Sequence, residues 1–303
     1  MTASHGTPGI MFKELCSAHN MYYNVSRYFR PLKEWIGFIR PINGLMGIVG
    51  TIISGLIALG LNISHHVFVI SVAAACVFLV TSGGNILNDL IDVDADRLNH
   101  PKRPLVTGSI KVSSAKVAFY VLFLAPIILS AAFLNVYATA IVFVAELLLV
   151  SYELKTKNLG LSGNITISIL VGLIFVFGGI ALNSPGRMLF LFLLAFLANL
   201  SREIIKDIQD MGGDVGRKTL PMSIGAKNAS YIALGIVVAV VVISYLPFYL
   251  SIFSIYYLLV VIFSDAAFLA SGYTALRDPG KGQQISKIGM ILGLLSFAVG
   301  GLT

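Results

Sequence analysis

Charged residues are scarce in this chain: Asp, Glu, Lys and Arg make up 12% of its 303 residues, whereas hydrophobic residues make up 57%. This balance excludes an ordinary soluble domain, in which about a quarter of the residues are charged. Cysteine is also scarce, because Cys16 and Cys76 are the only two and cannot form a disulfide framework. Ten-residue stretches of alternating polarity, typical of membrane barrels, are absent. The chain is therefore expected to be an all-α, polytopic membrane protein.

Long apolar stretches fill most of the sequence. A membrane-spanning helix needs about 20 predominantly apolar residues. The stretches that reach this length are about 35–60, 66–91, 115–134, 136–154, 164–183, 187–208, 228–247, 250–275 and 284–302. We therefore predict one transmembrane domain of nine helices over residues 35–303. The polar segment 1–34 precedes it, and its scattered aromatic and basic residues fit either an amphipathic helix on the membrane surface or an ordered cytoplasmic tail.

Lysine and arginine indicate the orientation of the bundle. They occur in the N-terminal segment and in the connections after the second, fourth, sixth and eighth stretches, whereas the opposite side holds Arg187. Because basic connections stay in the cytoplasm, the N-terminus is predicted to be cytoplasmic in a multi-pass protein of the cell membrane. The formal charge of +7 is thus mainly a topological signal, and no nucleic-acid partner is expected.

Two clusters of aspartate stand at predicted cytoplasmic helix ends. The first follows the second apolar stretch in the segment NDLIDVDAD, where the spacing i, i+4, i+8 brings three oxygen-bearing side chains onto one helix face. Its members are Asn88, Asp92 and Asp96. The second cluster follows the sixth stretch with the spacing i, i+3, i+7, and its members are Asp207, Asp210 and Asp214. Asp89 and Asp94 lie off the stacked face, so we expect them to be solvated acids.

Carboxylates one turn apart repel each other, so each cluster needs a cation. Mg²⁺ prefers oxygen ligands and binds through one or two carboxylates together with substrate phosphates. Basic residues accompany both clusters, namely Lys102, Arg103, Lys155, Arg202 and Lys206. Solvation explains a single acidic helix end equally well, and topology explains a single basic residue. Two clusters at matching positions on the same side favour a site that holds Mg²⁺ and a diphosphate.

Departure of a diphosphate from a prenyl group is the reaction that suits such a site, because metal ions and basic side chains stabilise the negative charge of the leaving group. The organic part would lie in the apolar bundle, away from water. We therefore predict an intramembrane prenyltransferase with two Mg²⁺ ions and a prenyl diphosphate donor. A secondary transporter is the alternative class, since it also uses intramembrane acids, although its ion sites lie near the bilayer midplane.

The motifs resemble those of the UbiA superfamily of intramembrane prenyltransferases. The motif NDxxDxxxD is matched by Asn88, Asp89, Asp92 and Asp96, and its continuation NxPxRP is matched by Asn99, Pro101, Arg103 and Pro104. The motif DxxDxxxD is matched by Asp207, Asp210 and Asp214, with Arg202 and Glu203 before it. A third motif, YSxxLK, is matched by Ser151, Leu154 and Lys155, but Val150 replaces its leading tyrosine and Tyr152 stands nearby.

The resemblance implies a role for each candidate residue. The implied metal ligands are Asn88, Asp92, Asp96, Asp207, Asp210 and Asp214. The implied catalytic residues are Asp92, Asp96, Asp210, Asp214 and Lys155. The implied substrate contacts are Asn43, Asn88, Arg103, Tyr152, Arg202 and Lys206.

The acceptor is the open part of the prediction. Within the family, the wording REIIKDIQD and the spacing from Asp96 to Arg103 favour an archaeal ether-lipid enzyme, which alkylates the free hydroxyl of geranylgeranylglyceryl phosphate. The alternative acceptor is an aromatic ring such as 4-hydroxybenzoate, in quinone synthesis. Glu146 and Asp265 lie within predicted spans, where each is either a functional group or a hydrogen-bonded structural acid.

Overall fold

A computed structural model describes residues 32–212 and 218–302 of the chain. Every element within these ranges is helical, apart from an isolated bridge between Leu159 and Lys218. Residues 32–39 are helical, and the elements that follow are α2 Pro41–Leu59, η1 Gly60–His66, α3 Val67–Ile91, α4 Val93–Asn99, α5 Pro104–Thr107, α6 Val112–Phe133, α7 Val136–Leu154, η2 Thr156–Asn158, α8 Leu161–Ala181, α9 Met188–Asp210, α10 Leu220–Ile224, α11 Ala226–Ser244, α12 Leu246–Tyr249, α13 Ile255–Ala275 and α14 Pro279–Leu302. The predicted all-α membrane bundle is confirmed.

The long helices follow the predicted apolar stretches to within two turns at their ends. In the described ranges, eight continuous helical stretches are long and apolar enough to cross a membrane. The first of them, Pro41–Ile91, contains α2, the 3₁₀ turns of η1 and α3. The count of nine crossings stays a prediction, as does the cytoplasmic N-terminus. The predicted N-terminal segment lies outside the described residues up to position 31.

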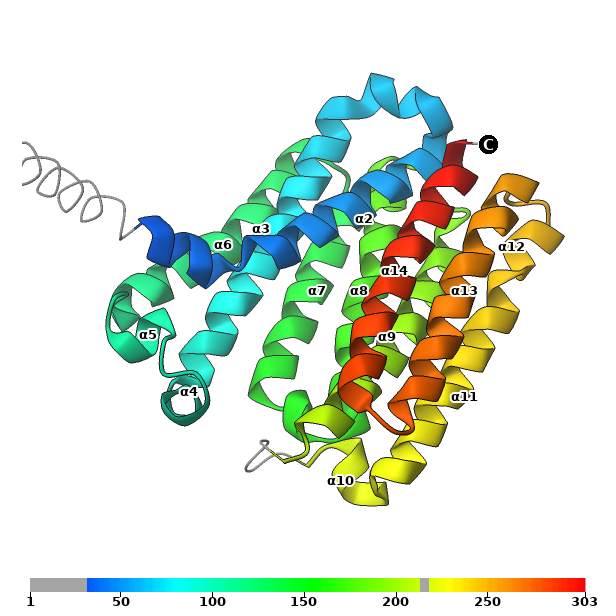
Figure 1. Ribbon diagram of the computed structural model, residues 1–303. Helices are drawn as coiled ribbons and strands as arrows, with labels where there is room; N and C mark the ends of the chain where they lie inside the picture. The colour runs from blue at the N-terminus through cyan, green and yellow to red at the C-terminus, as the bar shows by residue number, and fades with distance from the viewer. Residues whose placement is uncertain (1–31, 213–217, 303) are drawn as a thin grey trace, which may run out of the picture.

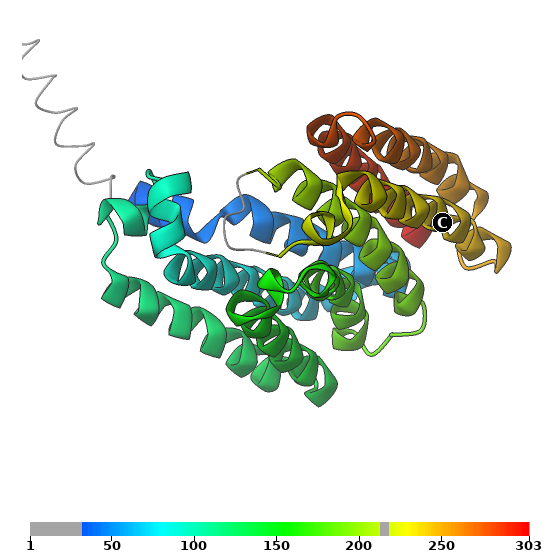
Figure 2. The ribbon, with the colours of Figure 1, turned by 90° about the horizontal axis from the view of Figure 1, so that it is seen from below.

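Both aspartate motifs lie at the same end of the bundle. Figure 1 shows the end of α3, with α4 after it, and the end of α9, with α10 after it, at the lower side, whereas the C-terminus lies at the upper side. Figure 2 looks onto that lower end. Helix α2 contacts α3, α8 and α14, so it links the first half of the chain to the last helix. The two motifs therefore face each other across the interior of one bundle.

Helix α14 begins with a side-chain cap on the same end of the bundle. The backbone N–H of Lys281 donates to Asp278 Oδ1 at 3.0 Å, and this hydrogen bond lowers the pKa of the exposed Asp278 carboxyl. The ammonium of Lys281 lies 3.2 Å from Asp278 Oδ2. The start of α14 is thus fixed by a local interaction that needs no other helix.

Glu146 is a buried acid in the middle of α7, and one of its carboxyl oxygens has no hydrogen-bond partner among the described residues. We expect the variant Glu146→Leu to raise the free energy of unfolding by about 1–3 kcal/mol, because the substitution removes a polar group that is buried without full hydrogen bonding. Thermal unfolding in detergent measures the change. The contrasting variant is Glu153→Leu, which should lower the free energy of unfolding because Glu153 is hydrogen-bonded. Destabilisation of the protein by Glu146→Leu would contradict the prediction.

Candidate functional site

A cavity of about 1600 Å³ opens between the two halves of the bundle. It is larger than the roughly 300–1000 Å³ of a typical small-molecule pocket. Side chains from α2, α3, α4, α7, α8, α9, α11, α13 and α14 line it. The residues of the two motifs lie at one end, and the deeper wall is apolar, with Leu173, Phe175, Phe177, Phe268 and Phe297 among its residues. A ligand with a charged head and a long hydrocarbon tail matches this division.

The first motif spans a break between two helices. Helix α3 ends at Ile91 and α4 begins at Val93, so the continuous helix expected through the motif is wrong. Asp92 lies at the break, where its N–H still donates to the carbonyl of Asn88 at 2.9 Å. The side-chain amide of Asn88 donates to Asp92 Oδ2 at 3.0 Å. Asn88, Asp92 and Asp96 all line the cavity despite the break.

Asp89 is not the solvated acid that the spacing predicted. Its side chain is 3% exposed and accepts hydrogen bonds from the guanidinium groups of Arg40 and Arg103, the latter at 3.0 Å. Arg103 also pairs with Asp96. The expectation failed because it considered one helix face alone, whereas the partners of Asp89 come from the start of α2 and from the loop after α4. Asp94, with a side chain 95% exposed, is solvated as expected.

Arg40 meets Asp89 from an unusual backbone position. It precedes α2 with φ 50°, in the left-handed region that side-chain-bearing residues rarely occupy. The amide of Asn85 on α3 donates to the carbonyl of Ile39 at 3.0 Å and fixes the neighbouring peptide. These contacts hold the entry into α2 against the motif end of α3.

Lys157 is a buried basic residue in direct contact with the first motif. Its ammonium donates to Asp92 Oδ1 at 2.7 Å and to Glu153 Oε2 at 2.8 Å, and its side chain is 5% exposed. Glu153 also accepts from Asn88 at 3.0 Å. Lys155, the predicted lysine, is exposed just after α7. Sequence reasoning missed both Lys157 and Glu153, although their i, i+4 spacing is that of an ion pair.

Glycine and asparagine at the start of α8 connect the two motifs. A β-carbon on Gly163 would lie 2.9 Å from the carbonyl oxygen of Thr156, so only glycine lets the segment with Lys157 pack this closely. The next residue, Asn164, donates to Asp207 Oδ2 of the second motif at 2.9 Å. The loop before α8 also pairs Leu159 with Lys218. Helix α8 therefore holds the loop that carries Lys157 close to the second motif.

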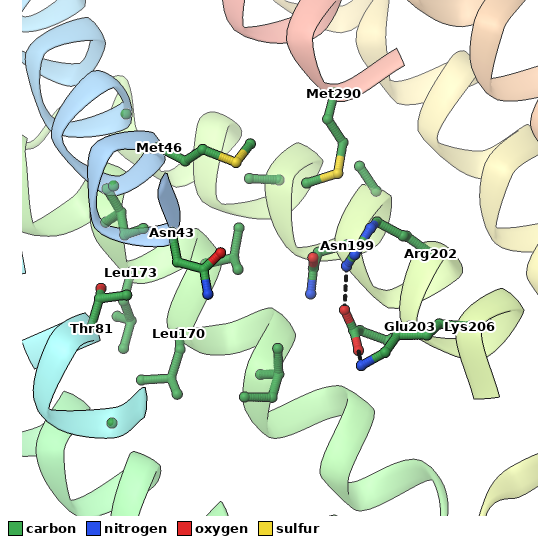
Figure 3. Close-up of a pocket in the computed structure, with 18 of the residues that line it drawn as sticks. Asn43, Met46, Thr81, Leu170, Leu173, Asn199, Arg202, Glu203, Lys206 and Met290 are labelled. Atoms are coloured by element: carbon green, nitrogen blue, oxygen red, sulfur yellow. Dashed lines mark hydrogen bonds and ion pairs between the residues drawn. The ribbon is translucent and has the colours of Figure 1, made fainter. Parts of the chain in front are cut away.

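The second motif supplies the opposite wall from α9. Figure 3 shows Asn199, Arg202, Glu203 and Lys206 lying along this helix, with Arg202 and Lys206 each paired to the Glu203 carboxylate. The Lys206 ammonium lies 3.8 Å from Glu203 Oε2. Asp210 lines the cavity beyond them. Asp214 lies outside the described residues.

Most of the predicted site residues thus meet at one cavity. Those that line it are Asn43, Asn88, Asp92, Asp96, Arg103, Tyr152, Arg202, Lys206 and Asp210. Of the other candidates that the structure describes, Lys155 and Asp207 do not line it. Asp265 does line it and accepts from Ser244 Oγ at 2.8 Å, as a hydrogen-bonded acid would. The catalytic roles of all these candidate residues stay predictions.

The ligand atoms of the first motif suit a hard divalent cation. Asn88, Asp92 and Asp96 line the cavity and carry amide and carboxylate oxygens, which are the donor type that Mg²⁺ prefers. Within 32–212 and 218–302, no group of three acidic, histidine or cysteine side chains is placed to hold a metal ion by itself. An open arrangement fits Mg²⁺, which usually keeps few protein ligands and binds substrate phosphates as well.

The family follows from comparison with known sequences. The model of the UbiA prenyltransferase family matches residues 48–296, which include both motifs and nearly the whole bundle. The chain belongs to the UbiA prenyltransferase family. This UbiA family member is therefore a multi-pass membrane protein of the prenyltransferase class, and the transporter alternative does not hold.

Curated relatives cover almost the full length of this UbiA family member. The digeranylgeranylglyceryl phosphate synthase of Methanosphaera stadtmanae is 34% identical over 278 residues, which are 89% of this chain and all of the relative. The synthase of the same name from Methanocaldococcus jannaschii is 36% identical over 286 residues, covering 91% of this chain and 98% of the relative.

Solved structures share the architecture. A digeranylgeranylglyceryl phosphate synthase structure superposes with a TM-score of 0.78 at 35% identity, covering 90% of this chain and 99% of the other. A UbiA homologue from Archaeoglobus fulgidus, solved with DMAPP and Mg²⁺, gives a TM-score of 0.61 at 17% identity over 88% of this chain and 99% of the other. At that identity the second likeness shows that the UbiA family member has the same fold.

Proposed function

We propose that this chain transfers a geranylgeranyl group from geranylgeranyl diphosphate to geranylgeranylglyceryl phosphate, in the Mg²⁺-dependent synthesis of archaeal ether lipids. The observation that carries the proposal is the cavity itself, in which residues of both motifs line one end and mainly apolar side chains line the rest. The choice of acceptor is supported by the relatives, which are named digeranylgeranylglyceryl phosphate synthase and match along 89–91% of this chain.

The reaction exchanges one carbon–oxygen bond for another. The bond between C1 of the donor and its diphosphate oxygen breaks, and the diphosphate leaves with the electron pair. The free hydroxyl oxygen of the acceptor forms a new bond to C1 and releases its proton. Binding both substrates in one apolar enclosure brings the hydroxyl to C1 and keeps water from attacking in its place.

The polar end of the cavity is proposed to hold the diphosphate. We assign Asn88, Asp92 and Asp96 to one Mg²⁺, and Asp207, Asp210 and Asp214 to a second. Bound there, Mg²⁺ would neutralise negative charge on the phosphates as the diphosphate departs. Arg103 and Lys157 lie against the first set and can donate to phosphate oxygens, and the Lys157 ammonium is already 2.7 Å from a ligand carboxylate.

The apolar part of the cavity is proposed to hold the two prenyl chains. Phe175, Phe177, Phe268 and Phe297 belong to its wall, and their apolar surface suits hydrocarbon chains. The polar end is proposed to open to the cytoplasm. That orientation is supported by the basic connections after α3, α7, α9 and α13, since basic loops stay on the cytoplasmic side.

Purified protein with Mg²⁺ and geranylgeranyl diphosphate tests the proposal directly. We expect a digeranylgeranyl ether when geranylgeranylglyceryl phosphate is added and no product when 4-hydroxybenzoate is added instead. Removal of Mg²⁺ with excess EDTA should abolish product formation, and added Mg²⁺ should restore it. Product analysis by mass spectrometry distinguishes the two acceptors. Prenylation of 4-hydroxybenzoate alone would make the acceptor assignment wrong, and turnover in EDTA would rule out the metal requirement.

A further inference from the structure

Lys287 is a lysine on the cavity wall that neither aspartate motif includes. It stands eight residues after Pro279, the first residue of α14, which corresponds to about 12 Å of helix. It lines the cavity together with Met290, Ile291 and Leu294, at the spacing i+3, i+4 and i+7 that belongs to one helix face. Its ammonium has no hydrogen-bond or ion-pair partner among the described residues. Lys287 is exposed, and it belongs to a helix that is long and apolar enough to cross a membrane, where an ionisable residue marks a functional candidate.

The neighbouring helix α9 places Arg202 at the level of Lys287. Helices α9 and α14 pack against each other and run in opposite directions, and Gly280 lies beside the side chain of Gln209. Lys287 comes seven residues after Gly280 in α14, and Arg202 comes seven residues before Gln209 in α9. Because both helices rise by the same amount per residue, Lys287 and Arg202 lie at about the same level. Figure 3 shows Met290 of α14 and Arg202 of α9 directed to the same cavity.

The charges on this wall match a phosphate monoester. Arg202, Lys206 and Lys287 are cationic, and Glu203, which pairs with the first two, is the carboxylate among them. Asp210, the other α9 carboxylate on the cavity, is assigned to Mg²⁺, so the three positive charges and the Glu203 carboxylate leave two positive charges. A phosphate monoester carries about −1.5 to −2 at pH 7. The first motif differs, because Arg40, Arg103 and Lys157 there face the four carboxylates of Asp89, Asp92, Asp96 and Glu153.

We propose that Lys287 binds the phosphate of the glycerophosphate acceptor, with Arg202 beside it, on the wall formed by α9 and α14. The donor diphosphate then lies toward the aspartate motifs, and the two phosphate-bearing substrates occupy different cationic groups. This inference rests on the proposed function. It also assigns to Lys287 the discrimination between a phosphorylated lipid acceptor and an acceptor without phosphate.

Steady-state kinetics of Lys287 variants test the assignment. Initial rates are measured against geranylgeranylglyceryl phosphate at saturating donor, then against donor at saturating acceptor, and finally with geranylgeranylglycerol, which lacks the phosphate. For Lys287→Met we expect KM for the phosphorylated acceptor to rise about 10- to 100-fold, the range for loss of a hydrogen bond to a charged group. KM for the donor should stay unchanged, and kcat/KM for geranylgeranylglycerol should equal that of the unaltered protein.

Three further variants serve as controls. Lys287→Arg keeps the charge and should retain KM within about threefold, whereas Lys287→Gln should behave as Lys287→Met does and guards against a folding defect of either neutral variant. Lys281→Met removes a lysine of the same helix that pairs with Asp278 and lies outside the cavity, and should leave both KM values unchanged.

The outcomes separate this inference from the proposed function. A raised KM for the donor, an equal effect on both acceptors or an unchanged KM in both neutral variants would overturn the role of Lys287. Failure of the unaltered protein to use geranylgeranylglyceryl phosphate would instead overturn the proposed function, and that result is obtained before any variant is made.

Discussion

Replacing Asp92 by alanine is expected to lower kcat by about 10³-fold, the upper range for loss of one group that stabilises charge in a transition state. Asp92 lies at the break between α3 and α4, beside Asn88, and accepts from Lys157 at 2.7 Å. The substitution removes a proposed Mg²⁺ ligand and also the carboxylate that positions Lys157. Initial rates at several Mg²⁺ concentrations measure the effect.

The matched control for Asp92→Ala is Asp94→Ala. Asp94 belongs to the same segment and carries the same charge, but its side chain is 95% exposed and it does not line the cavity. Its removal should change kcat by less than about twofold, because isolated surface charges contribute little. Equal activity of the two variants would remove Asp92 from the metal site.

The second large effect is expected at Lys157 rather than at Lys155. Lys157→Met should lower kcat by about 10²-fold, because the ammonium is buried between Asp92 and Glu153 at the polar end of the cavity. Lys155→Met should change kcat by less than about threefold, because Lys155 is exposed and does not line the cavity. Comparing kcat of the two variants under identical conditions shows which lysine the reaction needs: Lys157, as the structure indicates, or Lys155, as the motif predicts. A greater loss at Lys155 would favour the motif.

Loss of Lys157 also affects folding, so the test needs a stability control. The single variant leaves the buried Glu153 carboxylate without its cation, which costs about 3–5 kcal/mol when one member of a buried pair is removed. The double variant Lys157→Met with Glu153→Gln removes both charges and should recover most of the melting temperature. If catalysis needs the ammonium, activity stays low in the double variant. Recovery of activity together with stability would show that Lys157 acts only in folding.

Helix positions could be predicted from the sequence because a membrane span requires a long apolar stretch, and few other arrangements satisfy the backbone inside lipid. The predicted stretch 136–154 coincides with α7, and 66–91 differs from α3 by one residue at its start. The starts of α2 and α14 were less well placed. Helix α2 begins only at Pro41, because the backbone leaves the helical region at Arg40, whereas α14 begins before the predicted stretch, because polar and glycine residues continue it.

The pairing of the charged residues could not be predicted in the same way. Helical spacing identified Asn88, Asp92 and Asp96, but it assumed a continuous helix and considered one face, so it missed the break at Asp92 and the burial of Asp89. The partners of Asp89 lie 49 and 14 residues away, at Arg40 and Arg103. Such partners depend on how the helices pack together, and the spacing of residues along one helix carries no information about that packing. The role of Asp214, outside the described residues, stays a prediction.

The origin of the cations around the first motif has a consequence for biosynthesis. Arg40, Arg103 and Lys157 all precede α8, and so do the carboxylates that they contact. Because chains emerge from the ribosome N-terminal end first, these buried charges can be neutralised before α9 is synthesised. We expect a nascent chain that extends through α8 to insert with its acidic helix ends already paired, so that the second half completes the cavity on a preassembled first half.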